Sequence, residues 1–143
     1  MAIDFHTDLE QVDWAALEAL FVTAGLGGRS GDKLRRAFVQ SSAVCLAYDG
    51  GRLVGASRAL SDGEYHTLIY DVAVHPACQR QGIGRRLVES LLERLPAWRT
   101  MLVADEEVQP FYARLGFASY PDVMARLDWG RLYDESPPAT GGG

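Results

Sequence analysis

The sequence lacks the marks of several large protein classes. No uninterrupted apolar run approaches the roughly 18 residues of a membrane-spanning helix, and the first ten residues carry acidic side chains where a secretory signal carries basic ones. We therefore expect a cytoplasmic protein that makes no contact with a membrane. There are only two cysteines, Cys45 and Cys78, in unlike contexts far apart in the sequence. We expect both to be free thiols, with neither a disulfide framework nor a metal site.

Basic residues are also too few for a general nucleic-acid-binding surface. The chain has 14 Lys and Arg against 19 Asp and Glu, for a formal net charge of −5. Such a balance repels phosphate backbones, so we expect no nucleic-acid partner. The same charge is compatible with a cationic substrate.

What the chain does contain is enough apolar material for one core. Hydrophobic residues make up 48% of 143 residues, which is the size and composition of a single soluble domain. We expect that domain over residues 1–133. Residues 134–143 are rich in Pro and Gly, and we expect them to form a disordered tail.

The apolar periodicity switches between strands and helices along the chain. It predicts strands at residues 3–6, 43–48, 52–60, 66–74 and 100–104, helices at 12–22, 32–40, 83–95 and 108–115, and a last hairpin from 117–120 and 124–127. In the first helix the buried face should comprise Val12, Ala15, Ala16, Ala19, Leu20 and Val22, and Asp32 should cap the second. The predicted fold class is α/β (α+β): a mixed, mostly antiparallel central sheet with flanking helices and one βαβ unit.

The junction between the fourth strand and the third helix carries the strongest chemical signal. Gly82 and Gly84 lie at the start of that helix, where free N–H groups and the helix dipole bind anions. Taken alone, this pattern fits a tight turn equally well. A dinucleotide fingerprint is excluded because Leu87 occupies its third glycine position, and a Walker loop because no Gly-Lys-Ser/Thr follows.

Two motifs together resemble those of the GNAT superfamily of N-acetyltransferases. The run Gln79-Arg80-Gln81-Gly82-Ile83-Gly84 is similar to the superfamily's pyrophosphate loop, and Phe111-Tyr112-Ala113-Arg114-Leu115-Gly116-Phe117 to its tyrosine-bearing second signature. The resemblance covers roughly residues 40–127. Within the superfamily, residues 58–63 and 70–76 look most like the plant-plastid and cyanobacterial type of serotonin N-acetyltransferase.

The resemblance implies acetyl-CoA as cosubstrate. Its pantetheine arm would lie along the fourth strand like an added strand, and its pyrophosphate would meet the backbone of the glycine-bearing turn. Strict strand alternation would put Leu68, Tyr70, Val72 and Val74 on one face and Ile69, Asp71 and Ala73 on the other. The cofactor-binding residues implied are Val72, Ala73, Val74, Gln79, Arg80, Gln81, Gly82, Ile83, Gly84 and Arg85.

Two residues are candidates for catalysis. Tyr112 matches the family tyrosine that protonates the departing CoA thiolate; outside the signature it would be a core tyrosine. Asp71, a carboxylate within an apolar strand, either relays a proton from the incoming ammonium or attracts the ammonium, or else forms a structural ion pair with an arginine such as Arg58.

His66 is a reserve base, and Cys78 is expected to pack in the core. Asp105 replaces the asparagine of many family members and either faces the acceptor or caps a helix.

The predicted function is acetyl-CoA-dependent transfer of an acetyl group directly to a primary amine. We expect a small-molecule acceptor such as an arylalkylamine or a polyamine. The alternatives are acetylation of protein N-termini or lysines, and a non-catalytic CoA-binding module. The family resemblance also allows a homodimer.

Overall fold

The structure, a computed structural model, describes residues 2–132. The described residues divide into two compact units, 2–102 and 103–132. The tail expected over 134–143 lies outside the described residues, and the single domain expected over 1–133 stays a prediction.

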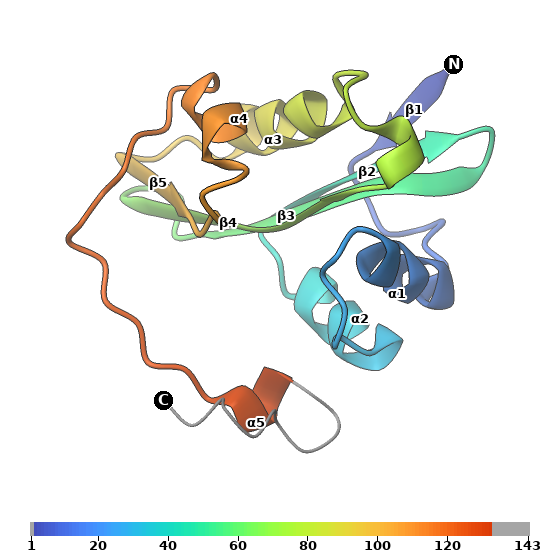
Figure 1. The fold of residues 1–143 in the computed structure, drawn as a ribbon, viewed down its shortest axis with the longest axis horizontal. Helices are drawn as coiled ribbons and strands as arrows, with labels where there is room; N and C mark the ends of the chain where they lie inside the picture. Colours follow the sequence, from blue (N-terminus) through green and yellow to red (C-terminus); the bar gives the residue numbers. More distant parts are fainter. Residues whose placement is uncertain (1, 133–143) are drawn as a thin grey trace. The chain divides into compact units, whose positions relative to one another are not determined.

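The first unit is built on a five-stranded sheet with the strands in sequence order (Figure 1). The strands are β1 (Ile3–His6), β2 (Ala43–Asp49), β3 (Arg52–Ser61), β4 (His66–Val74) and β5 (Arg99–Leu102). The first three pairings are antiparallel, and β4 pairs with β5 in parallel. The predicted mostly antiparallel sheet with one βαβ unit is confirmed.

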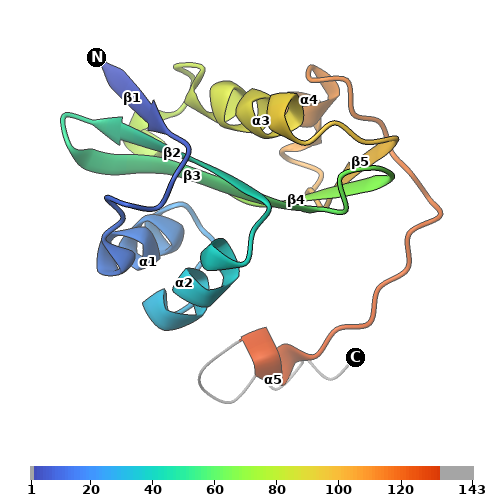
Figure 2. The ribbon, with the colours of Figure 1, turned by 180° about the vertical axis from the view of Figure 1, so that it is seen from behind.

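Helices cover both faces of this sheet (Figures 1 and 2). Helices α1 (Trp14–Thr23) and α2 (Gly31–Val39) pack on one face, and α3 (Ile83–Arg94) packs on the other. The core beneath α1 and α2 contains Leu17, Leu20, Phe21, Leu34, Phe38, Val44, Leu46, Tyr48, Ala56 and Ala73. The core beneath α3 contains Cys45, Ala47, Val54, Cys78, Ile83 and Leu87. None of the described helices is long and apolar enough to cross a membrane.

Two details of the first helices correct the sequence prediction. Val22 is 61% exposed, and the buried side of α1 is made by Leu17, Leu20 and Phe21, which recur at spacings of three and four residues. The cap of α2 is Ser30, whose Oγ accepts a hydrogen bond from the Lys33 N–H at 3.2 Å. Asp32 therefore lies inside the first turn, where its negative charge interacts favourably with the positive end of the helix dipole.

Glycines shape two places in the sheet. Gly50 and Gly51 join β2 to β3 with φ values of +57° and +88°, as a tight hairpin turn requires. Further along β3, a Cβ on Gly55 would lie 3.1 Å from Leu87 and 3.2 Å from Ile83. The bare backbone at Gly55 thus lets the first turns of α3 pack closely on β3.

The second unit, described over residues 103–132, contains α4 (Gln109–Ala113) and a short α5 (Trp129–Leu132). The hairpin predicted from 117–120 and 124–127 is wrong, because neither segment forms a strand. Val123 and Met124 are 54% and 95% exposed. A two-stranded hairpin is marginal when it has no apolar surface to cover.

Candidate active site

The pairing of β3 with β4 slips by one residue in the middle of the sheet. Arg58 faces Tyr70 and Ala56 faces Ala73, so Asp71 and Val72 together stand opposite one residue of β3. Asp71 has a φ of +56°, a left-handed conformation that aspartate tolerates better than most residues. This is a β-bulge, which bends the strand and changes the direction of its side chains.

The bulge overturns the strict alternation that the sequence predicted for β4. The Tyr70 ring contacts Arg58, while Ala73 packs in the core beneath α1 and α2 and Val74 packs in the core beneath α3. Val74 and Tyr70 were expected on the same face. The extra residue at the bulge exchanges the faces beyond Asp71.

Past the bulge, one edge of β4 is open within residues 2–102. Pairing with β5 runs from His66 opposite Arg99 to Ile69 opposite Leu102 and ends there. Residues 72–74 therefore pair with β3 on one side and with no strand of the first unit on the other. An edge with free N–H and C=O groups can accept an extended, amide-bearing chain as an added strand.

The α3 N-terminus follows this edge through a short loop. Arg80 and Gly82 both have positive φ, at +65° and +80°, and Gly82 is the N-cap residue without any side-chain cap. The first intrahelical bond runs from Arg86 N–H to the Gly82 carbonyl, which leaves the preceding N–H groups for an anion. A Cβ built on Gly82 meets nothing within 4 Å, so a phosphate has open access.

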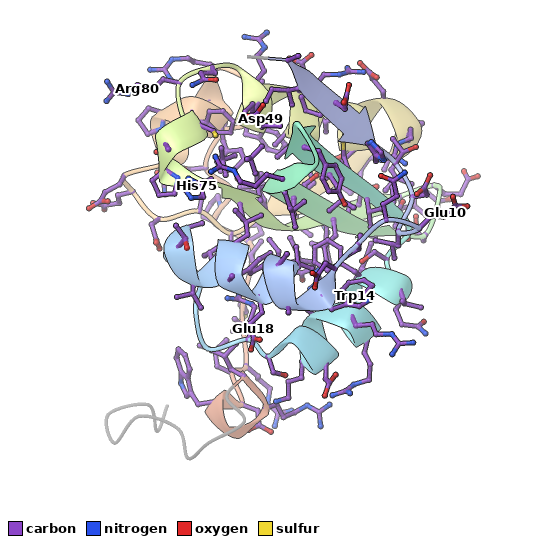
Figure 3. All side chains as sticks on the ribbon, turned by 90° about the vertical axis from the view of Figure 1, so that its right-hand side faces the viewer. Glu10, Trp14, Glu18, Asp49, His75 and Arg80 are labelled. Carbon is purple, nitrogen blue, oxygen red and sulfur yellow. The ribbon has the colours of Figure 1, made fainter. Side chains whose placement is uncertain are left out.

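The arginines around this turn differ in their availability. Arg85 pairs with Glu89 at 2.5 Å and Arg86 with Glu93 at 3.3 Å, both along α3. Arg80 extends into solvent (Figure 3) and has no hydrogen bond or ion pair to the described part of the chain. Of the three, Arg80 is the cation available to a phosphate.

Two side-chain hydrogen bonds stabilise the loop between β4 and α3. The Gln79 side chain donates a hydrogen bond to the Val74 carbonyl at 3.3 Å, and the His75 imidazole accepts one from Ala77 N–H at 3.1 Å. Cys78 is 1% exposed and packs in the core beneath α3. These contacts hold the loop that connects the β4 edge to the α3 N-terminus.

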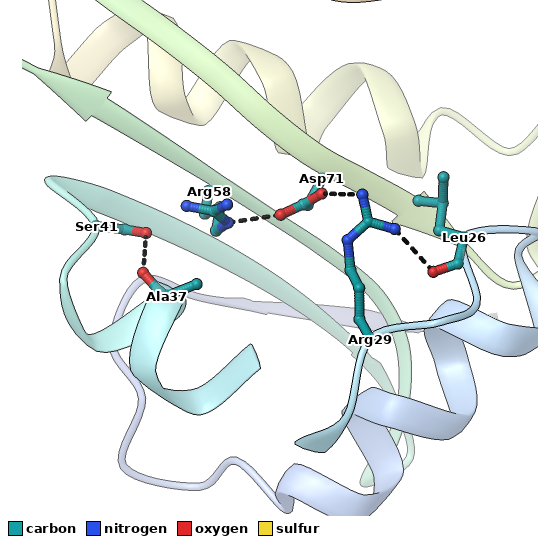
Figure 4. A network of polar contacts seen from close by, with 6 residues as sticks. All are labelled: Leu26, Arg29, Ala37, Ser41, Arg58 and Asp71. Carbon is teal, nitrogen blue, oxygen red and sulfur yellow. Dashed lines mark hydrogen bonds and ion pairs between the residues drawn. The ribbon is translucent and has the colours of Figure 1, made fainter. Parts of the chain in front are cut away.

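Asp71 lies between two arginines on the face of the sheet covered by α1 and α2 (Figure 4). Its Oδ2 accepts a hydrogen bond from Arg58 Nε at 2.6 Å, and its Oδ1 lies 3.4 Å from Arg29 Nη2. The Asp71 side chain is only 8% exposed. The ion pair with Arg58, one of the alternatives open from the sequence, is therefore present, and Arg29 adds a second.

Arg29 is the residue that sequence analysis missed. It belongs to the loop between α1 and α2, where Gly25 and Gly28 both have positive φ. Its Nη1 donates a hydrogen bond to the Leu26 carbonyl at 2.9 Å, which folds the loop around its side chain. No local pattern marks Arg29, because its partner Asp71 is 42 positions away in the sequence.

In the second unit, Tyr112 of α4 lies within a small aromatic cluster. Its ring centroid is 4.9 Å from that of Phe111 and 5.9 Å from that of Phe117. The Phe117 N–H donates to the Tyr112 carbonyl at 3.1 Å, just after Gly116 turns the chain with a φ of +94°. Burial raises the pKa of the Tyr112 phenol above its ordinary value, so the hydroxyl keeps its proton across the neutral range.

The remaining candidates have simpler surroundings. His66 begins β4 on the exposed side, with its ring 6.0 Å from Trp98 and 6.4 Å from Tyr65. Asp105 is exposed, and its backbone carbonyl accepts hydrogen bonds from Val108 N–H at 3.0 Å and from Gln109 N–H of α4 at 3.2 Å. Helix α4 has no side-chain cap, so capping by the Asp105 carboxylate is not observed. Within residues 2–132 no group of His, Cys, Asp and Glu could hold a metal.

An open strand edge followed by an uncapped, glycine-bearing helix start is the arrangement that the GNAT resemblance implied. The acetyltransferase (GNAT) family matches residues 7–117. This chain belongs to the GNAT acetyltransferase family. The cofactor of that family is acetyl-CoA, and the residues at the β4 edge and the α3 N-terminus suit its amide-bearing arm and its phosphates.

Relatives within the GNAT family differ in the acceptors that their names record. A chloroplastic serotonin N-acetyltransferase of Oryza sativa subsp. japonica is 36% identical over 120 residues, which is 79% of this chain and 60% of the relative. A histone acetyltransferase of Glycine max is 38% identical over 81 residues, or 54% of this chain and 35% of the relative. The chain thus spans about 60% or less of the length of these two relatives.

Solved structures agree on the fold. A GNAT-family acetyltransferase from Streptococcus pneumoniae superposes with a TM-score of 0.75 at 27% identity, covering 88% of this chain and 96% of that one. The predicted GNAT-like architecture is confirmed.

Proposed function

We propose that this protein is an acetyl-CoA-dependent N-acetyltransferase that transfers the acetyl group directly to a primary amine. The observation that carries the proposal is the open β4 edge at residues 72–74, which a short loop with a Gln79–Val74 hydrogen bond connects to an uncapped α3 N-terminus at Gly82. These groups suit an extended amide chain and a pyrophosphate in the order in which CoA presents them.

In this proposal, different segments of the chain bind the pantetheine arm and the pyrophosphate of the cofactor. The backbone of Val72, Ala73 and Val74 pairs with the pantetheine amides, and the N–H groups from Arg80 to Arg85 hold the pyrophosphate. Arg80 adds the free positive charge at that turn. Acetyl-CoA supplies the activated acetyl thioester, and the protein's part is to orient it and to handle the protons of the transfer.

The proposal gives Tyr112 and Asp71 different roles. The Tyr112 phenol, whose pKa burial raises, is a proton donor that stays protonated at neutral pH and protonates the leaving thiolate. Asp71 is held by two guanidinium groups, so much of its attraction for an incoming ammonium is already compensated. The contacts of Asp71 favour a role in positioning the bulge; removal of the amine proton by Asp71, by His66 or by water stays a prediction.

For the acceptor we propose a small primary amine, and arylalkylamines and polyamines are the two classes to compare. The serotonin named for the Oryza sativa relative supports the first of these classes. Cytoplasmic location and a homodimer are likewise predictions.

The test is release of free CoA thiol from acetyl-CoA with a panel of arylalkylamines, polyamines and a lysine peptide, together with thermal melting in CoA. A ligand that binds only the native state stabilises it by RT ln(1 + [L]/Kd), about 2.7 kcal/mol at a hundredfold excess over Kd. We expect a rise in Tm with CoA and thiol release with at least one small amine. No shift at millimolar CoA would refute the cofactor assignment; a shift without turnover of any amine would indicate a non-catalytic CoA-binding module.

A further inference from the structure

The cluster formed by Arg29, Asp71 and Arg58 has an uncompensated charge. Guanidinium groups stay protonated in proteins, so the cluster holds two positive charges and one negative charge. No other described acidic side chain pairs with either arginine. The cluster carries a net charge of one positive unit in a protein whose overall charge is −5.

Arg58 uses its Nε within the cluster and leaves its two Nη atoms for a ligand. Its Nε is bound to Asp71, and its Cζ lies 5.9 Å from the Phe38 ring centroid and 5.2 Å from that of Tyr70. The Nη atoms have no hydrogen-bond partner among residues 2–132, and they are not sealed from solvent. A guanidinium held by aromatic rings and a carboxylate, with its Nη donors free, suits a bidentate oxyanion.

Arg29 adds a second, more accessible cation to the same place. Its side chain is 29% exposed, against 15% for Arg58 and 8% for Asp71. The hydrogen bond to Leu26 and the ion pair with Asp71 hold it in one orientation (Figure 4). Two oriented guanidinium groups therefore converge on the α1–α2 side of the bulge.

The cluster lies directly before the strand edge that is proposed to hold the cofactor. Asp71 immediately precedes Val72, so the cationic pair borders the start of the proposed cofactor-binding backbone. From this placement, and resting on the proposed acetyltransferase function, we infer that the acceptor is a primary amine that carries an oxyanion group, a carboxylate or a phosphate, bound by Arg29 and Arg58. The same charge disfavours polyamines, whose second ammonium group is repelled.

The experiment compares acceptors that differ only in the anionic group. Tryptophan against tryptamine tests a carboxylate, and phosphoethanolamine against ethanolamine tests a phosphate, with spermidine as the polycation. Rates are expressed per concentration of neutral amine, because the anionic group itself changes the amine pKa. We expect kcat/KM to be about tenfold or more higher for the anionic member of at least one pair, the usual size of one charge-assisted contact.

Variants show whether this preference comes from the cluster. Arg29→Gln should reduce the ratio of kcat/KM within the preferred pair severalfold, because only Arg58 then contacts the oxyanion, and Arg29→Lys should keep most of it. Arg35→Gln removes an exposed arginine of α2 outside the cluster and should leave the ratio unchanged. The CoA-induced rise in Tm should be the same in all three variants, which separates acceptor selection from cofactor binding.

The outcomes separate the two proposals. Turnover in which the neutral member of both pairs, or spermidine, is the better acceptor would overturn the oxyanion inference and leave the acetyltransferase function intact. A preference for the anionic member that is undiminished in Arg29→Gln would also overturn the assignment to this cluster. If CoA raises Tm but no amine is acetylated, the acetyltransferase function fails and the inference falls with it.

Discussion

Arg58 Nε lies 2.6 Å from Asp71 Oδ2, and this contact joins β3 to β4 at the point where their pairing slips by one residue. The left-handed conformation of Asp71 costs about 1–2 kcal/mol for an L-residue. A charge-assisted hydrogen bond in a half-buried site contributes about 1.5–3 kcal/mol. The ion pair is therefore strong enough to hold the bulge that opens the β4 edge.

Asp71→Asn should destabilise the fold by about 3 kcal/mol, because it leaves two half-buried arginines without their counter-charge. Urea unfolding followed by circular dichroism measures the change. Asp49→Asn is the matched control, since the Asp49 side chain at the end of β2 has no hydrogen bond or ion pair to the described residues. Equal stability losses in the two variants would contradict the structural role of the Asp71 ion pairs.

The pH dependence of the same variant separates positioning from proton removal. A positioning residue predicts a fall in kcat/KM for Asp71→Asn that is the same at every pH. A general base predicts the largest fall at low pH, where an amine of pKa about 10 is mostly protonated, with partial rescue as the pH rises. We expect the pH-independent result, and rescue at high pH would assign proton removal to Asp71.

Gly82→Val should abolish CoA binding while the fold survives. Valine strains the backbone at a φ of +80°, and its branched side chain blocks the approach of phosphate to the N–H groups of α3. Gly63→Val is the matched control, because Gly63 has a φ of +82° and equally open surroundings in the turn between β3 and β4. Both variants should lose similar stability, but only Gly82→Val should lose CoA binding in calorimetry. Normal binding by Gly82→Val would place the phosphate site elsewhere.

Tyr112→Phe should lower kcat by roughly a hundredfold with little change in CoA affinity, as expected when one general acid is lost. Because burial raises the pKa of this phenol, the wild-type rate should hold through neutral pH and fall only above the ordinary tyrosine value of about 10. Tyr65→Phe is the control, since Tyr65 is 66% exposed. Unchanged kcat in Tyr112→Phe would remove Tyr112 from the mechanism.

The raised pKa of Tyr112 also predicts a change in stability with pH. The folded state holds the phenolic proton more tightly than the unfolded state does, so this contribution to stability is complete below the unfolded pKa of about 10. It is lost as the pH rises from there through the folded pKa. Urea unfolding between pH 8 and pH 11 should show a smaller decline in Tyr112→Phe than in wild type; parallel declines would contradict it.

Gly55→Ala should destabilise the fold by about 1–3 kcal/mol, because a Cβ there would press on Leu87, Ala47 and Ile83 at 3.1–3.2 Å. Ile83 is the first residue of α3, so relief of the overlap would also displace the turn that is proposed to bind the phosphates. We expect a lower Tm and weaker CoA binding together. Full CoA affinity in a destabilised Gly55→Ala would show that α3 adjusts without moving its N-terminus.

Local patterns in the sequence predicted most of the sheet and the glycine-bearing turn that leads into α3. Apolar periodicity and turn residues such as Gly50 and Gly51 act over a few positions, and so does the helix start at Gly82. These signals were confirmed in β2, β3, β4 and α3, within one or two residues at their ends. The hairpin predicted at residues 117–120 and 124–127 does not form, because exposed apolar residues such as Met124 do not form strands without a surface to cover.

The sequence by itself determined the family, the succession of strands and helices along the chain, and the position of the glycine-bearing turn, because each is written in short local patterns. Only the tertiary structure decided the bulge at Asp71 and the convergence of Arg29 and Arg58 on it. A bulge arises from the register between two strands, and an ion pair between residues 42 positions apart depends on how the α1–α2 loop packs on the sheet. Neither register nor packing is encoded in any short segment.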